Sequence, residues 1–374
     1  MLHALALRIM ALPALALRAL AFCLLLAPAA VHSRDVVVAT YDAGMSFSGP
    51  GIMLQHLTKA DDPQVEAGVA VIAHLNADVL LLTYFDYDYD GVALTALQTR
   101  LRALGLEYPE ALALRPNTGV PTWLDLNHDG QLSGPRDAQA YGRFAGQAGM
   151  AILSRFPIDR DHILDLTGFL WKDLPQADLP PDLAPEAALL QRLSTSGHYV
   201  VPLTYDAGKT LTLLVWSATP PVFDGPEDRN GRRNADETSL WLHLLRGTLP
   251  SSATSAYPVP AAPFVLMGQP NLDPYDGDGK PQAMLDLLAA PFVQDPQPRG
   301  TSGRIDPEHT GDPALDTALL GKSDVGLRLD MILPSAGITV AEAFVMWPPS
   351  ADPFAATLGL ASRHRPVWVR LTLP

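Results

Sequence analysis

Polar residues that close or interrupt short apolar runs are the first places to look for chemistry in this sequence. Asp42, Tyr84, Ser217, Gln269 and Asp330 all stand in such positions. In layered α/β proteins the ligand site gathers at strand ends and in the loops that leave them. We therefore take these side chains as the leading candidates for a functional site.

A second candidate is an acidic loop that could hold a hard cation. Asp125, Asn127 and Asp129 stand at positions one, three and five of a calcium-loop pattern, and a glycine for the sharp turn follows them. The twelfth position, a glutamate in that pattern, is Arg136. Structural calcium binding and a plain Asp/Gly turn both stay open for this loop.

The densest charge cluster offers a third candidate. Arg229, Arg232 and Arg233 lie just before an expected helix, where backbone N–H groups and guanidinium forks can together hold a phosphate or carboxylate. Neighbouring acidic residues can instead pair with these arginines and fix the loop. Anion binding and local ion pairing are therefore both open, and His198 is a further candidate for substrate binding.

Alternating apolar and amphipathic segments must position these side chains. Apolar runs of strand length predict buried strands, and stretches with apolar residues at three-to-four spacing predict helices. The predicted class is α/β, with layered sheets in one domain after an N-terminal targeting segment. The predicted strands are residues 36–42, 79–84, 150–154, 211–217, 264–269, 329–333 and 367–372, and the predicted helices are residues 65–75, 92–104, 235–245 and 283–288.

Composition excludes several classes of protein. Of the 374 residues, 48% are hydrophobic, so a sizeable core is expected and a disordered chain is excluded. The net charge of −14 repels phosphate backbones and disfavours nucleic acid as a partner. The single cysteine, Cys23, lies in the targeting segment, which excludes disulfides and Cys-ligated zinc in the mature chain.

Residues 1–33 have the layout of a signal peptide. Arg8 and Arg18 punctuate a stretch of Ala and Leu, and the apolar run 19–27 leads to small residues before Arg34. That run is shorter than the roughly 20 residues needed to cross a bilayer. The sequence therefore predicts cleavage, a mature domain of residues 34–374 without a membrane anchor, and export to the periplasm or the cell exterior.

Six motifs in order resemble those of the endonuclease/exonuclease/phosphatase superfamily. They are residues 39–42, 76–84, 149–158, 268–271, 328–335 and 362–364, and they extend across nearly the whole mature chain. The resemblance implies an α/β sandwich of two mostly antiparallel or mixed sheets flanked by helices. It also implies a phosphoesterase site at one end of the sandwich, dependent on Mg²⁺ or Mn²⁺.

The resemblance further implies roles for single residues. Asp42 and Asn271 stand at positions that could ligate the metal, and Asp330, His364 and Asn271 at positions of the catalytic set. Four positions depart from the family pattern: Tyr84 replaces a metal-binding Glu, Ser217 a catalytic His, Gln269 a water-orienting Asp, and Arg363 an Asp beside the last His. We expect that the guanidinium of Arg363 can take the space of the ion and donate to a phosphate or to Asp42.

These departures leave alternative functions open. One is an exported pseudoenzyme with impaired phosphohydrolase chemistry that acts as a binding or scaffold module. Another is an active metal-dependent hydrolase of a small or extracellular phosphoester, and a third is a calcium-stabilised interaction protein. A small phosphoester or another anionic ligand is the expected partner, and the sequence makes no prediction of oligomeric state.

Overall fold

The computed structural model describes residues 33–250, 257–307, 309–321 and 325–374. The chain divides into two units, one of residues 35–373 and one of residues 1–34 together with Pro374. The signal-peptide prediction falls, apart from Ser33, outside the described residues, and export therefore stays a prediction. Within the described residues, none of the helices has the length and apolar character needed to cross a membrane.

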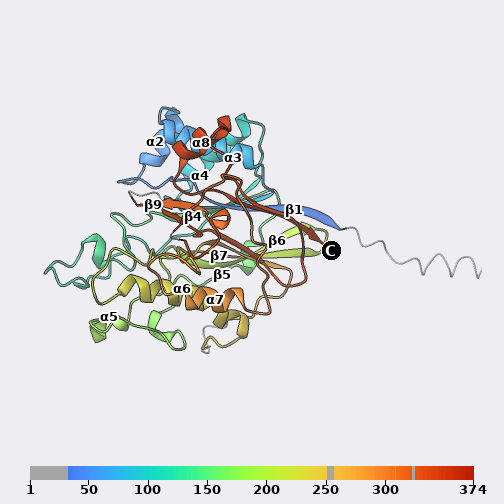
Figure 1. The fold of residues 1–374 in the computed structure, drawn as a ribbon. Helices are drawn as coiled ribbons and strands as arrows, with labels where there is room; N and C mark the ends of the chain where they lie inside the picture. Colours follow the sequence, from blue (N-terminus) through green and yellow to red (C-terminus); the bar gives the residue numbers. More distant parts are fainter. Residues whose placement is uncertain (1–32, 251–256, 308, 322–324) are drawn as a thin grey trace, which may run out of the picture. The chain divides into compact units, whose positions relative to one another are not determined.

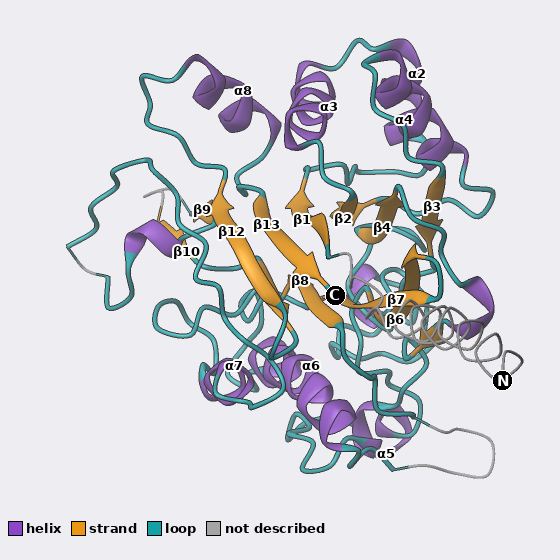
Figure 2. Ribbon diagram, turned by 90° about the vertical axis from the view of Figure 1, so that its right-hand side faces the viewer, coloured by secondary structure: helices purple, strands orange, loops and turns teal. Residues whose placement is uncertain are grey.

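Two β-sheets pack against each other in the larger unit (Figures 1 and 2). The β1–β2 and β7–β8 pairs are parallel, whereas the β2–β4, β6–β7 and β12–β13 pairs are antiparallel. The predicted α/β sandwich is therefore confirmed. One sheet has the order β12 (Thr339–Val345), β13 (Val367–Leu373), β1 (Arg34–Asp42), β2 (Val79–Phe85), β4 (Gly149–Ser154), β3 (Glu110–Ala113), and the other β11 (Met331–Pro334), β8 (Phe264–Gln269), β7 (Lys209–Ser217), β6 (Gly197–Asp206), β5 (Leu164–Asp165).

The alternation of side chains along the strands builds the core between the sheets and delivers polar residues to its end. Val36 and Val38 of β1 pack with Leu213 of β7 in the apolar core between the sheets. Since residues two apart share a face of the strand, Asp42 follows Val38 onto this inner face, and Ser217 follows Leu213. The strand ends therefore carry the predicted site residues into the space where the sheets meet.

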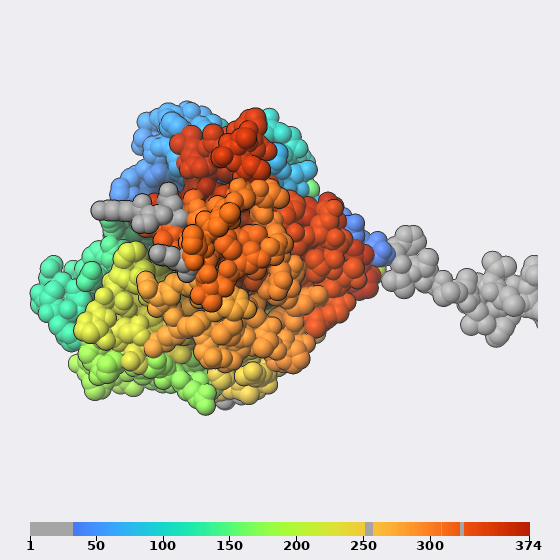
Figure 3. All heavy atoms as spheres, viewed as in Figure 1, coloured from blue at the N-terminus to red at the C-terminus, as the bar shows by residue number. Residues whose placement is uncertain are grey.

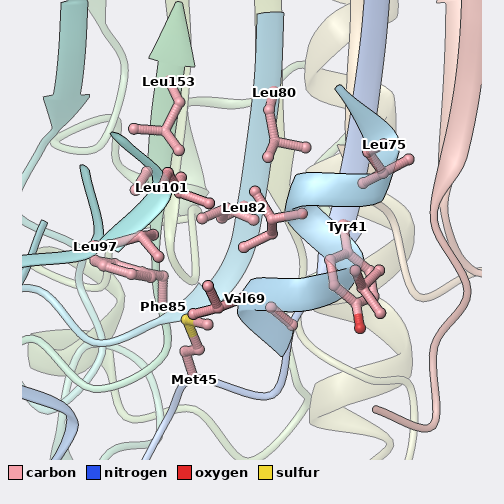
Figure 4. Packing of buried hydrophobic residues seen from close by; sticks show 14 of the residues in the cluster. Tyr41, Met45, Val69, Leu75, Leu80, Leu82, Phe85, Leu97, Leu101 and Leu153 are labelled. Atoms are coloured by element: carbon pink, nitrogen blue, oxygen red, sulfur yellow. The ribbon is translucent and has the colours of Figure 1, made fainter. Parts of the chain in front are cut away.

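Helices cover the two outer faces of the sandwich (Figure 1). Above the larger sheet, buried side chains of β1, β2 and the helices interlock, with Tyr41, Leu82, Leu97 and Val69 among them (Figure 4). A separate apolar cluster joins α6 and α7 to the smaller sheet. The first group of helices is α2 (Ile52–Lys59), α3 (Pro63–Leu75), α4 (Val92–Ala103) and α8 (Pro353–Ala361), and the second is α6 (Arg229–Arg246) and α7 (Gln282–Leu288).

The C-terminal helix α8 lies beside the N-terminal helix α3, as the adjoining red and blue surfaces show (Figure 3). Gln64 joins them, because its Nε2 donates to the carbonyl oxygen of Ala361 at 2.6 Å and to that of Ala43 at 2.9 Å. Ala43 directly follows β1, and Ala361 ends α8. This link holds the segment that contains His364 next to the end of β1.

Candidate functional site

The retained aspartate and histidine form a buried pair. His364 Nδ1 lies 2.7 Å from Asp330 Oδ2. Thr317 Oγ1 donates to the same carboxylate oxygen at 2.8 Å and accepts from the backbone N–H of Asp330 at 3.0 Å. Asp330 is fully buried and His364 is 8% exposed. The pair therefore has a fixed orientation, with the other ring nitrogen, Nε2, directed at the end of β1.

Gln269 occupies the centre of the site. Its Nε2 lies 3.2 Å from Asp42 Oδ2, 3.3 Å from Asn271 Oδ1 and 3.4 Å from His364 Nε2. The remaining oxygen of Asp42, Oδ1, accepts from the backbone N–H of Gly44 at 2.8 Å. One neutral amide thus links the two residues predicted as metal ligands and lies beside the predicted catalytic histidine.

Burial and charge set the protonation of this cluster. Burial raises the pKa of Asp42, and the neighbouring His364 opposes that rise. Burial alone would lower the pKa of His364, but the carboxylates of Asp330 and Asp42 outweigh it and raise the pKa to about 9. Burial, with a contribution from Asp42, also raises the pKa of Tyr84, so the phenol there stays neutral.

The residues that the fold brings together do not fit a divalent metal. Mg²⁺ holds its waters tightly and needs carboxylate ligands to replace them. Here Asp42 is the one carboxylate in the predicted pair of ligands, and both its oxygens and the Asn271 Oδ1 already face N–H donors. Among the described residues, no group of three or more His, Cys, Asp or Glu side chains is placed to hold a metal ion.

The predicted role of Arg363 as a replacement for the ion is wrong. Its Nε donates to the carbonyl oxygen of Leu319 at 2.6 Å, and its Nη2 to that of Gly321 at 2.8 Å. The cause is its pairing with β9 (Ala318–Leu320), where the backbone carbonyl oxygen of Arg363 also accepts from the backbone N–H of Leu319 at 3.0 Å. The guanidinium of Arg363 is therefore bound to β9 and to Gly321, which follows it, rather than to Asp42.

The arginine cluster is also placed differently from the prediction. Arg229, Arg232 and Arg233 lie inside α6, whose first residue is Arg229, rather than before it. Arg232 pairs with Asp178, and Arg229 donates to the carbonyl oxygen of Leu126 at 3.0 Å. Arg233 is buried and donates to four backbone carbonyl oxygens, those of Gln139, Arg192, Leu193 and Ser194. These bonds hold the loops that surround the helix start and do not form an anion cradle.

His198 belongs to the core. Its Nε2 donates to the carbonyl oxygen of Glu237 at 2.8 Å, so its Nδ1 accepts from the Ser194 hydroxyl at 2.7 Å. Burial lowers the pKa of His198 to about 3, and the ring is neutral. Both ring nitrogens are therefore engaged within the protein rather than presented to a substrate.

The acidic loop forms a hydrogen-bonded turn. Asp125 accepts from the backbone N–H groups of Asp129 and Gly130, at 3.0 and 2.8 Å. Asp129 accepts from the backbone N–H of Gln131 at 2.9 Å and from Asn127 Nδ2 at 3.0 Å. This is the geometry of the plain Asp/Gly turn. Calcium binding by Asp125, Asn127 and Asp129 stays a prediction.

A cleft of about 650 Å³ opens next to the cluster and reaches it at Tyr84 and Ser217. Ser217 is 1% exposed, and its Oγ has no hydrogen-bond partner in the described structure. Within the described residues, the lining of this cleft includes neither Asp42 nor His364. The cleft therefore borders two of the replaced positions, Tyr84 and Ser217.

Glu237 of α6 shapes the cleft wall through its partners, a role that sequence reasoning did not assign to it. Glu237 is fully buried, accepts from the backbone N–H of Thr219 at 2.8 Å, and also binds the backbone and hydroxyl of Thr195. Arg233 and Glu237 are four residues apart and therefore share one helix face. This spacing of a base and an acid was the available signal.

The sequence model of the endonuclease/exonuclease/phosphatase family matches residues 58–364. The chain belongs to this family. The match spans most of the chain and includes Tyr84, Ser217, Gln269 and His364, so the four departures and the retained pair lie inside a family domain. A search of the curated proteins found no match.

Several solved structures resemble this chain. The endonuclease/exonuclease/phosphatase from Beutenbergia cavernae is 17% identical, with a TM-score of 0.51 over 91% of this chain and 72% of that chain. Sphingomyelinase C from Streptomyces griseocarneus is 14% identical, with a TM-score of 0.48 over 90% and 99% of the two chains. The family protein from Bacteroides vulgatus is 12% identical, with a TM-score of 0.49 over 91% and 100%. The likeness to the Beutenbergia cavernae protein, at 17% identity, shows the fold alone.

Proposed function

We propose that this member of the endonuclease/exonuclease/phosphatase family has lost metal-dependent phosphoester hydrolysis and works, outside the cytoplasm, as a binding protein. The position of Gln269 carries the proposal. Its amide nitrogen lies within 3.3 Å of the Asp42 and Asn271 oxygens that a cation would need. A neutral donor at this point satisfies those lone pairs without a metal.

The chemistry of Gln269 and of Ser217 also supports the loss of hydrolysis. Hydrolysis of a phosphoester needs an activated water and groups that neutralise charge in the transition state. Gln269 is not a base, and Ser217 supplies no imidazole. Residues that act as a unit in catalysis fail together when several are removed. The cleft borders Ser217, and its volume of about 650 Å³ is large enough for a small molecule.

The intact His364–Asp330 pair is the observation that favours a second candidate, an active divalent-metal phosphoesterase. Its ring-to-carboxylate distance of 2.7 Å is that of a working acid–base pair. Such an enzyme would act on a small or extracellular phosphoester. It would need the Asp42 and Asn271 side chains to turn from Gln269 toward a metal.

Turnover of chromogenic phosphomonoesters and phosphodiesters separates the two candidates. The mature chain is assayed with Mg²⁺, Mn²⁺ or Ca²⁺ beside a His364→Ala variant. A His162→Ala variant, with its histidine on the exposed surface, is the matched control for purification. We expect no turnover above that of His364→Ala. Metal-dependent turnover that His364→Ala abolishes and His162→Ala retains would refute the binding-protein proposal.

A further inference from the structure

The charges that line the cleft balance. Arg136, Arg229 and Arg233 face the same space as Asp182, Asp224 and Glu227. Arg233 already donates hydrogen bonds to four backbone carbonyl oxygens, and Arg229 donates one to the carbonyl oxygen of Leu126. A bound anion would therefore meet neither surplus positive charge nor the guanidinium fork of Arg233. The electrostatics of the cleft suit a ligand without net charge.

The cleft wall contains buried hydrogen-bond acceptors that have no partner within the described residues. Gln191 is 3% exposed, and its Nε2 donates to the carbonyl oxygen of Gln139 at 2.6 Å. Within the described residues, its Oε1 has no partner, and neither do Ser217 Oγ or Asn127 Oδ1. All three residues line the cleft. Buried polar groups are nearly always hydrogen-bonded, so these atoms point to a ligand that donates hydrogen bonds.

Aromatic rings lie on the cleft lining where solvent reaches it. Phe223 is 83% exposed and Tyr141 is 61% exposed. A flat exposed ring offers its face to an apolar surface of a ligand. A ligand that matches this site has apolar patches as well as hydroxyl donors.

We propose that this cleft binds a neutral saccharide. A sugar ring carries several hydroxyl donors for acceptors such as Gln191 Oε1 and Ser217 Oγ. Its C–H face packs on aromatic rings such as those of Tyr141 and Phe223, and it brings no charge to a balanced cleft. This inference rests on the proposed function, since it treats the cleft as a binding site rather than as the substrate site of a phosphoesterase.

The test begins with a glycan array that presents neutral and charged glycans to the mature protein. The neutral glycan retained most strongly is then titrated calorimetrically into the wild type and into a Tyr141→Ala/Phe223→Ala variant. A Tyr89→Ala/Tyr275→Ala variant is the control, because it also removes two exposed rings, and neither ring belongs to the described lining of this cleft. We expect about tenfold weaker binding for the first variant and unchanged binding for the control.

Three results would overturn the saccharide proposal. They are retention of no neutral glycan on the array, equal loss of binding in both double variants, and displacement of the glycan by inorganic phosphate. Each leaves the loss of hydrolysis intact, because turnover is measured separately on phosphoesters. Conversely, metal-dependent turnover would refute the proposed function whatever the titrations show.

Discussion

The buried carboxyl of Glu237 makes a quantitative prediction about stability and pH. Burial raises the pKa of Glu237 to about 7 from an ordinary value of 4.5, and the nearby Arg233 opposes the rise. The folded chain therefore binds more protons than the unfolded chain between these two pH values. The contribution of the Glu237 carboxyl to the free energy of unfolding is highest below pH 4.5 and is lost as the pH rises toward about 7. At about 1.4 kcal/mol per pH unit, the loss is about 3 kcal/mol.

A Glu237→Gln variant isolates this effect. Glutamine cannot ionise. Any destabilisation from a side-chain N–H that faces the backbone N–H of Thr219 is therefore the same at every pH. The difference in free energy of unfolding between variant and wild type should therefore shift by about 3 kcal/mol in favour of the variant across that pH range. The buried His198 contributes an opposite slope below pH 6.5, but it is present in both proteins and cancels in the difference.

Urea unfolding of both proteins at a series of pH values measures this difference. A His198→Gln variant is the internal check, because removal of the buried neutral imidazole should change the slope in the opposite sense. A difference between Glu237→Gln and wild type that stays constant from pH 4.5 to about 7 would refute the reasoning. It would mean that Glu237 titrates as an ordinary surface carboxyl.

Two substitutions test the packing that supports the site. Trp171→Phe removes the Nε1–H donor that binds Asp236 Oδ2 at 2.6 Å, and we expect a loss of about 2 kcal/mol in the free energy of unfolding, measured by urea titration. Leu213→Ala opens a cavity in the fully buried core between the sheets and should cost about 3 kcal/mol. Leu360→Ala, at a half-exposed position of α8, is its control and should change stability by less than about 0.5 kcal/mol. Equal effects of the two leucine substitutions would contradict the assignment of the core.

The strands that the sequence predicted are those with uninterrupted apolar runs. Runs such as residues 211–217 are buried on both faces, because one face of the sheet packs on the other sheet and the opposite face packs on helices. Strand β6 was missed because Pro202 and several polar residues interrupt its pattern. Strand β12 is an edge strand that pairs only with β13, and it was missed because it is largely exposed and carries Glu342. Apolar periodicity reports burial, so the largely exposed β12 leaves little signal, whereas β6 is largely buried and its signal is interrupted at Pro202.

The start of α6 was not visible for a related reason. The apolar pattern begins at Ala235, and the six preceding residues are Arg, Asn and Gly, which read as a loop. In the structure this polar segment is helical and partly buried, because Arg233 and Asn234 donate to backbone carbonyl oxygens of several loops. Partners so distant in sequence leave no local pattern.

Some features of the candidate site could likewise be predicted from the sequence, and others could not. The positions that meet, Asp42, Gln269, Asn271, Asp330 and His364, could be named from strand ends and from the family resemblance. The direction of Arg363 and the hydrogen bonds of the Gln269 amide could not, because they depend on backbone direction and side-chain rotamers at the point of contact. The sequence shows which groups are present, and the structure shows which atoms are already engaged.

Binding of Mn²⁺ followed by electron paramagnetic resonance tests the central claim most directly. Wild type, Asp42→Asn and Asp125→Asn are titrated with Mn²⁺, the last variant to separate the acidic loop from the cluster around Gln269. If the Gln269 amide holds the oxygens of Asp42 and Asn271, wild type and Asp42→Asn bind the same amount of Mn²⁺ at every concentration. A bound Mn²⁺ that Asp42→Asn removes and Asp125→Asn retains would contradict the account.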